Sequence, residues 1–222
     1  MNFVIRVLTK DLLIEWRAKT HGIALAAFAL TLLLLFSFAV GPTTAVLQRH
    51  ASAYLWMSLL LSSTLLLSRS FSIETESDAL ESLLLAPVPP GAIFLGKAIS
   101  ATLQMLLLML IAMPAAVIFY DIQIAGSVLE LFFCFLLGVG GLAAPGTLYA
   151  ALTARMHARA LMMPLLLFPL VVPCVLAAVK TTSLLLLGDP MDQSGSWLVL
   201  LLCFDLVYWS LCLVLTSRVI EE

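Results

Sequence analysis

Mostly apolar stretches of roughly 20 residues alternate along the chain with short polar connections. A helix that crosses the ~30 Å hydrocarbon core of a membrane needs about 20 such residues, because each backbone amide must find its hydrogen-bond partner inside the segment. The pattern therefore predicts an all-α polytopic membrane protein with six membrane-spanning helices, at residues 23–40, 51–68, 98–119, 128–153, 161–179 and 197–216. Residues 180–187 are expected either to extend the fifth helix or to form a short interfacial helix.

The first 19 residues differ from this pattern. Ile5, Leu8 and Leu12 recur at helical spacing, whereas Arg6 and Lys10 gather on another side. This arrangement predicts an amphipathic helix at residues 2–19 that lies in the membrane interface. The alternative is a cytoplasmic extension of the first span.

Composition supports a membrane location for the whole chain. Of the 222 residues, 63% are hydrophobic and 11% are charged, and the mean hydropathy is +1.14, whereas soluble domains carry about 25% charged residues. We expect one transmembrane domain over residues 1–222, in contact with the lipid bilayer. The net charge of −2 without a basic block argues against nucleic-acid binding. No cleavage site follows the charged start, so we expect no removable signal peptide.

Basic residues are distributed unevenly between the two sides of the membrane. Six spans place both termini on one side, and that side carries nine basic residues, whereas Arg49 and Lys180 fall on the other. The nine are Arg6, Lys10, Arg17, Lys19, Arg69, Lys97, Arg155, Arg159 and Arg218. Because positively charged connections remain in the cytoplasm, both termini are predicted to be cytoplasmic.

The connection at residues 69–97 is the long one on the cytoplasmic side. Residues 74–81 include four carboxylates, four leucines lie between positions 80 and 85, and Pro87, Pro89 and Pro90 follow. A short helix from Glu74 to Leu85, stopped by the prolines, is expected. It would present leucines to a partner or to the interface, since a loop that is only solvated needs no such row. The alternative is a solvated loop that avoids lipid.

Two acidic residues fall within the predicted spans, where a charge costs at least ~2.5–3.5 kcal/mol unless it faces a partner or water. Asp205 lies near the middle of the last span, and Glu130 lies near the outer end of the fourth. Glu130 is interpreted as an interface residue. For Asp205 two interpretations stay open: a structural hydrogen bond to a neighbouring helix, or a place on a transport path or partner surface.

Prolines and glycines within the spans predict breaks. The fourth span contains Pro145 and Gly146 and is expected to be bent or broken near its middle, and the fifth contains Pro169 and Pro173.

No enzyme or metal motif is present. The chain lacks P-loop, HExxH, GxSxG and CxxC patterns, and the four cysteines lie in apolar runs without a disulfide framework. His21, His50 and His157 are scattered over different connections. We therefore predict a non-catalytic protein without a metal, in which any ATP hydrolysis belongs to a partner.

Several motifs together carry a resemblance to a known family. They are Glu74, Leu80-Glu81, the leucine run with Pro87-Val88-Pro89, Leu95-Gly96-Lys97, Ala144-Pro145-Gly146, Arg155 and Pro169 to Pro173. Because these motifs occur in this order, the chain resembles the haem-exporter B subunit (CcmB) over nearly its whole length. That subunit is an ABC-2-like exporter permease of bacterial cytochrome c maturation. It departs at Asp78-Ala79, where the family usually has a glycine, and at residues 155–159, which lack one.

The resemblance implies a permease subunit of the bacterial inner membrane that works as a homodimer. The expected partners are a cytoplasmic ABC ATPase, a second copy of the chain, a haem-handling membrane subunit, a small single-span subunit and a periplasmic haem chaperone. It assigns contact with the ATPase to Glu74, Asp78, Leu80, Glu81, Leu83, Leu84, Pro87 and Pro89. It implies haem as the substrate of the complex, with either haem export or ATP-driven release of the haem-loaded periplasmic chaperone as its role. No cofactor is expected on this chain itself.

Three other functions fit parts of the sequence. A permease of the same fold could export a lipid, polysaccharide or drug, and a neighbouring haem-handling protein would distinguish the two. A secondary transporter could carry protons through Asp205 and Glu130, but it predicts paired broken helices and internal repeats. A passive scaffold would tolerate changes in the cytoplasmic connection.

Overall fold

The computed structural model describes residues 2–17, 19–41, 43–76, 90–153 and 159–221. Within these ranges the chain forms helices and no strand. The helices are α1 (Asn2–Arg17), α2 (Lys19–Val40), α3 (Thr44–Glu76), α5 (Pro90–Tyr120), α6 (Val128–Thr153), α7 (Arg159–Leu187) and α8 (Ser194–Glu221). Six of them, all except α1, are long and apolar enough to cross a membrane. The predicted all-helical fold with six spans is confirmed.

Several helices continue beyond the predicted spans. α3 contains 33 residues and α5 contains 31. At about 1.5 Å per residue each is longer than the ~30 Å hydrocarbon core. α7 continues through Lys180 to Leu187, so residues 180–187 extend the fifth span. Hydropathy identifies only the part of a helix that is suited to lipid. Backbone hydrogen bonds continue beyond that part, so the helix extends into the polar residues that flank it.

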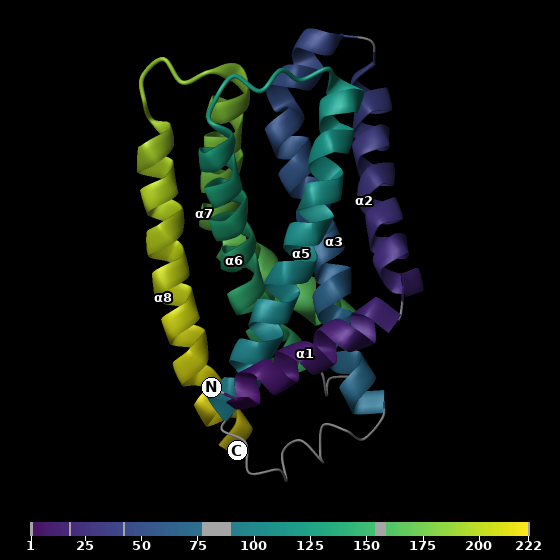
Figure 1. The fold of residues 1–222 in the computed structure, drawn as a ribbon, viewed down its shortest axis with the longest axis vertical. Coiled ribbons are helices and arrows are strands. Elements are labelled where there is room, and N and C mark those ends of the chain that lie inside the picture. The colour runs from purple at the N-terminus through teal and green to yellow at the C-terminus, as the bar shows by residue number, and fades with distance from the viewer. Residues whose placement is uncertain (1, 18, 42, 77–89, 154–158, 222) are drawn as a thin grey trace.

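The six long helices run along the long axis of the molecule, and α1 lies across one end (Figure 1). Both chain termini lie at this end, which we call the lower end. The α2–α3, α5–α6 and α7–α8 connections lie at the opposite, upper end. The two termini therefore share one side of the bundle, as six spans require.

Small residues allow α6 to run through the interior of the bundle. α6 contacts α3, α5, α7 and α8, and each residue from Gly138 to Leu148 is buried. A side chain at Gly138 would collide with the ring of Trp56, which is fully buried in α3. The Trp56 Nε1 group donates a hydrogen bond to Thr182 Oγ1 of α7 at 2.9 Å. In lipid the hydrophobic effect does not drive helices to associate. Close backbone approach and interhelical hydrogen bonds hold them together instead.

The breaks expected in the fourth and fifth spans do not occur within the described residues, whereas the bend expected in the fourth span stays a prediction. α6 is continuous across Pro145 and Gly146, and α7 is continuous across Pro169 and Pro173. Gly146 instead provides space, since a Cβ atom there would collide with the Leu67 side chain of α3. Packing from neighbouring helices supports a proline-containing helix in a membrane bundle, so the proline costs a hydrogen bond without ending the helix.

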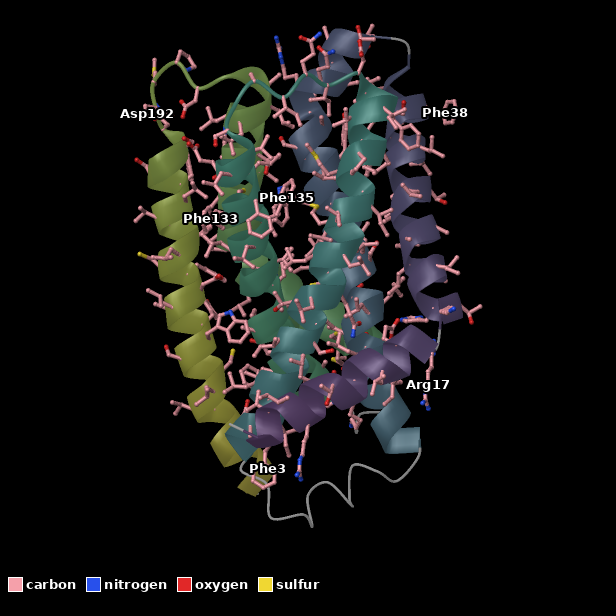
Figure 2. All side chains as sticks on the ribbon, in the orientation of Figure 1. Phe3, Arg17, Phe38, Phe133, Phe135 and Asp192 are labelled. Atoms are coloured by element: carbon pink, nitrogen blue, oxygen red, sulfur yellow. The ribbon has the colours of Figure 1, made fainter. Side chains whose placement is uncertain are left out.

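The N-terminal amphipathic segment forms a helix of its own. α1 ends at Arg17 and α2 begins at Lys19, and the two run in different directions in Figure 1. The alternative of one continuous extension of the first span is therefore wrong. Val7 is buried against the bundle, whereas Phe3, Ile5 and Leu13 are exposed, and Phe3 points away from the helices in Figure 2. These exposed apolar side chains are compatible with the predicted position in the membrane interface.

Candidate coupling site

The residues predicted to contact an ATPase belong to the connection between α3 and α5. Glu74 belongs to the last turns of α3. The others, Asp78, Leu80, Glu81, Leu83, Leu84, Pro87 and Pro89, lie outside the described residues, as does most of the short helix expected at 74–85. What the structure describes is how the two ends of this connection are held at the lower end of the bundle.

Lys97 joins the two ends of the connection. It lies in the third turn of α5, and its side chain is only 1% exposed. The Lys97 Nζ group donates a hydrogen bond to the backbone carbonyl of Ser70 in α3 at 3.2 Å. The helix that enters the connection and the helix that leaves it are therefore linked by one buried ammonium group.

The same ammonium group also binds α1. Lys97 Nζ lies 3.5 Å from Asp11 Oδ2, and the Asp11 side chain is 11% exposed. The other carboxylate oxygen, Asp11 Oδ1, lies 3.4 Å from Nζ of Lys10, whose side chain is 38% exposed. A charge so far removed from water requires a partner of opposite sign and good hydrogen bonds. Lys97 therefore connects α1, α3 and α5.

A close backbone contact lies next to this ion pair. A Cβ atom on Gly96 would lie 2.7 Å from Val7 Cβ and 3.2 Å from the Val4 carbonyl oxygen. Only glycine therefore allows α1 to approach α5 this closely. The contact prevents α1 from sliding on α5 and keeps Asp11 within reach of Lys97.

A small polar cavity adjoins the Lys97 cluster. It has a volume of about 30 Å³, enough for about one water molecule. Arg69 Nη1 lies 3.1 Å from His21 Nδ1 at its edge, which links α3 to α2. Burial raises the pKa of the Glu15 carboxyl group, and the positive charge of Arg69 acts in the opposite direction. The lining residues are Asp11, Ile14, Glu15, His21, Leu66, Arg69, Ser70 and Gln104.

This arrangement can transmit a displacement. A movement of the α3–α5 connection acts on Ser70 and Lys97 together, and the Lys97–Asp11 contact passes it to α1. Because buried, interlocked contacts deform little, α1 and the adjoining parts of α3 and α5 are expected to move as one unit. The described residues contain no group of three or more His, Cys, Asp or Glu side chains that could hold a metal.

The two acidic residues predicted within the spans lie apart. Glu130 lies in the first turn of α6 at the upper end, where its Oε2 accepts a hydrogen bond from Ser194 Oγ at 3.3 Å. Asp205 is the twelfth of the 23 residues of the last span, at mid-depth. The structure does not bring the two carboxylates together as a proton relay would require.

Sequence reasoning did not find the cluster of Asp11, Ser70 and Lys97. One signal was present, because Lys97 follows an apolar run and begins a spanning segment, where an unpaired ammonium group is costly. The partner could not be identified, since Asp11 lies 86 positions earlier in the chain.

Comparison with known proteins gives one consistent result. A family model described as "CcmB protein" matches residues 2–218. The chain is 35% identical to Heme exporter protein B of Rhodobacter capsulatus over 171 residues, which cover 77% of this chain and 78% of that protein. It is 28% identical to Heme exporter protein B of Bradyrhizobium diazoefficiens over 201 residues, 90% of this chain and 89% of the relative. The chain is also 35% identical to the protein of the same name from Paracoccus denitrificans over 174 residues, which cover 77% of this chain and 78% of that protein.

Proposed function

Because the chain belongs to the CcmB protein family, we propose that it is the membrane permease subunit of an ABC transporter complex for cytochrome c maturation. The family match over residues 2–218 carries the proposal, and the six long apolar helices support it. Relatives named Heme exporter protein B indicate haem as the substrate of the complex. The chain is a multi-pass protein of the bacterial inner membrane in this proposal, with both termini in the cytoplasm.

Energy for transport comes from a separate cytoplasmic ATPase in this proposal. Residues 69–97 form the segment that contacts it, with leucines as anchors and carboxylates that fix the register. Closure of the ATPase dimer displaces this segment. The Lys97 cluster supports the next step, because it offers a route by which the displacement reaches α1, α3 and α5 as a rigid unit.

The remaining partners follow from the same assignment. The permease works as a homodimer, with a haem-handling membrane subunit, a small single-span subunit and a periplasmic haem chaperone. Haem is handled by the complex, and this chain contributes motion rather than a haem ligand.

Purification in mild detergent tests the proposal. A tagged chain expressed in its native host should retain an ATPase subunit that hydrolyses ATP, and the complex should show a haem absorption band. An unrelated six-span protein with the same tag is the control. A stable chain that retains neither an ATPase nor a haem-handling protein would contradict the proposal.

Cysteine labelling tests the orientation. The native cysteines other than Cys203 are buried, so Cys203→Ser provides a background with little labelling. In that background Ser196→Cys, at an exposed position near the upper end of α8, should react with a membrane-impermeant thiol reagent added to whole cells. Ser77→Cys should react only after the cells are opened. The reverse pattern would place the termini outside.

A further inference from the structure

Asp205 is an acidic residue at mid-membrane, and one oxygen of its carboxyl group lacks a hydrogen-bond partner in the part of the chain that the structure describes. Its Oδ1 atom is buried and has no hydrogen-bond partner among the described residues. It lies in α8, of which 11% of the spanning window is buried, the lowest share among the six spans. A carboxylate in this position requires a proton, a cation or a donor, because hydrocarbon provides none.

The surface of α6 is shaped to receive this carboxylate. A Cβ atom on Gly140 would lie 2.9 Å from Asp205 Oδ2, and one on Gly141 would lie 2.9 Å from Asp205 Oδ1. The two glycines therefore leave the space that the carboxyl group occupies. Glycine itself supplies no side-chain donor to the carboxyl group.

A groove on the lipid-facing side of α8 includes Asp205 in its lining. It has a volume of about 330 Å³ and is lined by Leu95, Asp205, Leu206, Trp209, Ser210 and Leu213. Leu206 and Leu213 are exposed, and the Ser210 hydroxyl already donates to the Val207 carbonyl of its own helix at 2.9 Å. Apart from the carboxylate, the surface that faces lipid is therefore almost entirely apolar.

We propose that this groove docks a transmembrane helix of another protein that carries a basic side chain at mid-depth. An apolar helix covers the leucines, and its ammonium or guanidinium group reaches Asp205. Charge complementarity carries the inference, since a carboxylate in low dielectric gains most from a cation with which it also forms a hydrogen bond. The inference does not rest on the proposed ATPase partner or on haem.

A second copy of the chain does not satisfy these requirements. Copies related by an axis along the membrane normal present equal residues at equal depths. Asp205 lies about 16 Å below the start of α8 at 1.5 Å per residue. The basic residues of the described spans are instead buried, as Lys97 is, or lie toward helix ends, as Arg49, Arg69 and Lys180 do. The occupant is therefore a different chain.

Model peptides in vesicles test the proposal. The purified protein is placed in phosphatidylcholine vesicles with a fluorescent 23-residue leucine-rich helix that has lysine at its centre. Energy transfer from a donor on Ser196→Cys, in the Cys203→Ser background, reports association. The lysine-centred peptide is expected to bind at least tenfold more tightly than peptides with leucine or glutamine at the centre.

Variants of the protein locate the binding site. Asp205→Asn should abolish the preference for lysine, and Asp205→Glu should retain most of it. Ser210→Trp, which fills the groove and leaves Asp205 in place, should weaken binding of the lysine peptide. Asp192→Asn is the matched control, because it removes an exposed carboxylate in the upper connection (Figure 2) at a positive φ of 52° that asparagine tolerates.

Three results would overturn the proposal. Equal binding of the lysine and leucine peptides to the wild-type protein would show that Asp205 is neutralised within its own chain. A lysine preference that persists in Asp205→Asn would place the contact elsewhere. Loss of self-association, rather than of peptide binding, in the groove variants would identify a second copy as the occupant.

Discussion

Replacement of Lys97 by methionine is expected to lower the free energy of unfolding by about 3–5 kcal/mol, because it removes the buried partner of the Asp11 carboxylate and leaves it only the more exposed Lys10 among the ion pairs described. Methionine fills most of the lysine volume, so the effect reports the lost charge and the lost hydrogen bond to Ser70 rather than a cavity. Thermal unfolding in detergent, followed by tryptophan fluorescence, measures the change. The same variant should lose ATP-driven function, since the polar contacts by which Lys97 joins α1, α3 and α5 are removed.

A double-mutant cycle separates the pair from its surroundings. Combining Lys97→Met with Asp11→Leu removes both charges and should restore most of the stability, because apolar replacements of a buried pair are often neutral. Lys10→Met is the matched control. Its ammonium group also lies near Asp11, but on the exposed side of α1, so about 0–1 kcal/mol is expected. Additive effects of Lys97→Met and Asp11→Leu would show that the two side chains are not coupled.

Leu84→Asp and Glu81→Lys are each expected to abolish copurification of the ATPase, while the protein still inserts and forms dimers. Leucine anchors dominate the binding energy of a contact of this kind. Loss of an anchor that contributes at least about 2 kcal/mol lowers the affinity for the ATPase more than tenfold. Glu81→Lys places a mismatched charge in the same contact. The ratio of ATPase to permease after affinity purification measures the effect.

Glu76→Gln is the matched control for these variants and should leave the ratio unchanged. Membrane fractionation and crosslinking establish that each variant is inserted and dimeric. If Leu84→Asp and Glu81→Lys both retain the ATPase and support cytochrome c maturation, residues 77–89 form a solvated loop and the contact lies elsewhere.

The number and positions of the long helices follow from the sequence because a membrane imposes a local rule. Each backbone amide must be satisfied within its own segment, so length and apolar composition identify a spanning helix without knowledge of its neighbours. The amphipathic pattern of the first 19 residues depends on equally local spacing. The motifs that indicated the family also lie in continuous stretches, as in Ala144-Pro145-Gly146.

Only the tertiary structure decided which residues meet. Lys97 finds Asp11 86 positions away, and Gly138 faces Trp56 across helices. Pro145 lies in an unbroken helix because α6 is held on several sides. The Asp205 carboxyl group fits against α6 because Gly140 and Gly141 lie opposite it. Such contacts depend on the rotation of each helix about its axis and on its tilt. A uniformly apolar sequence does not determine either, because lipid can contact any face of the helix. Close packing at small residues determines which face contacts the neighbouring helices.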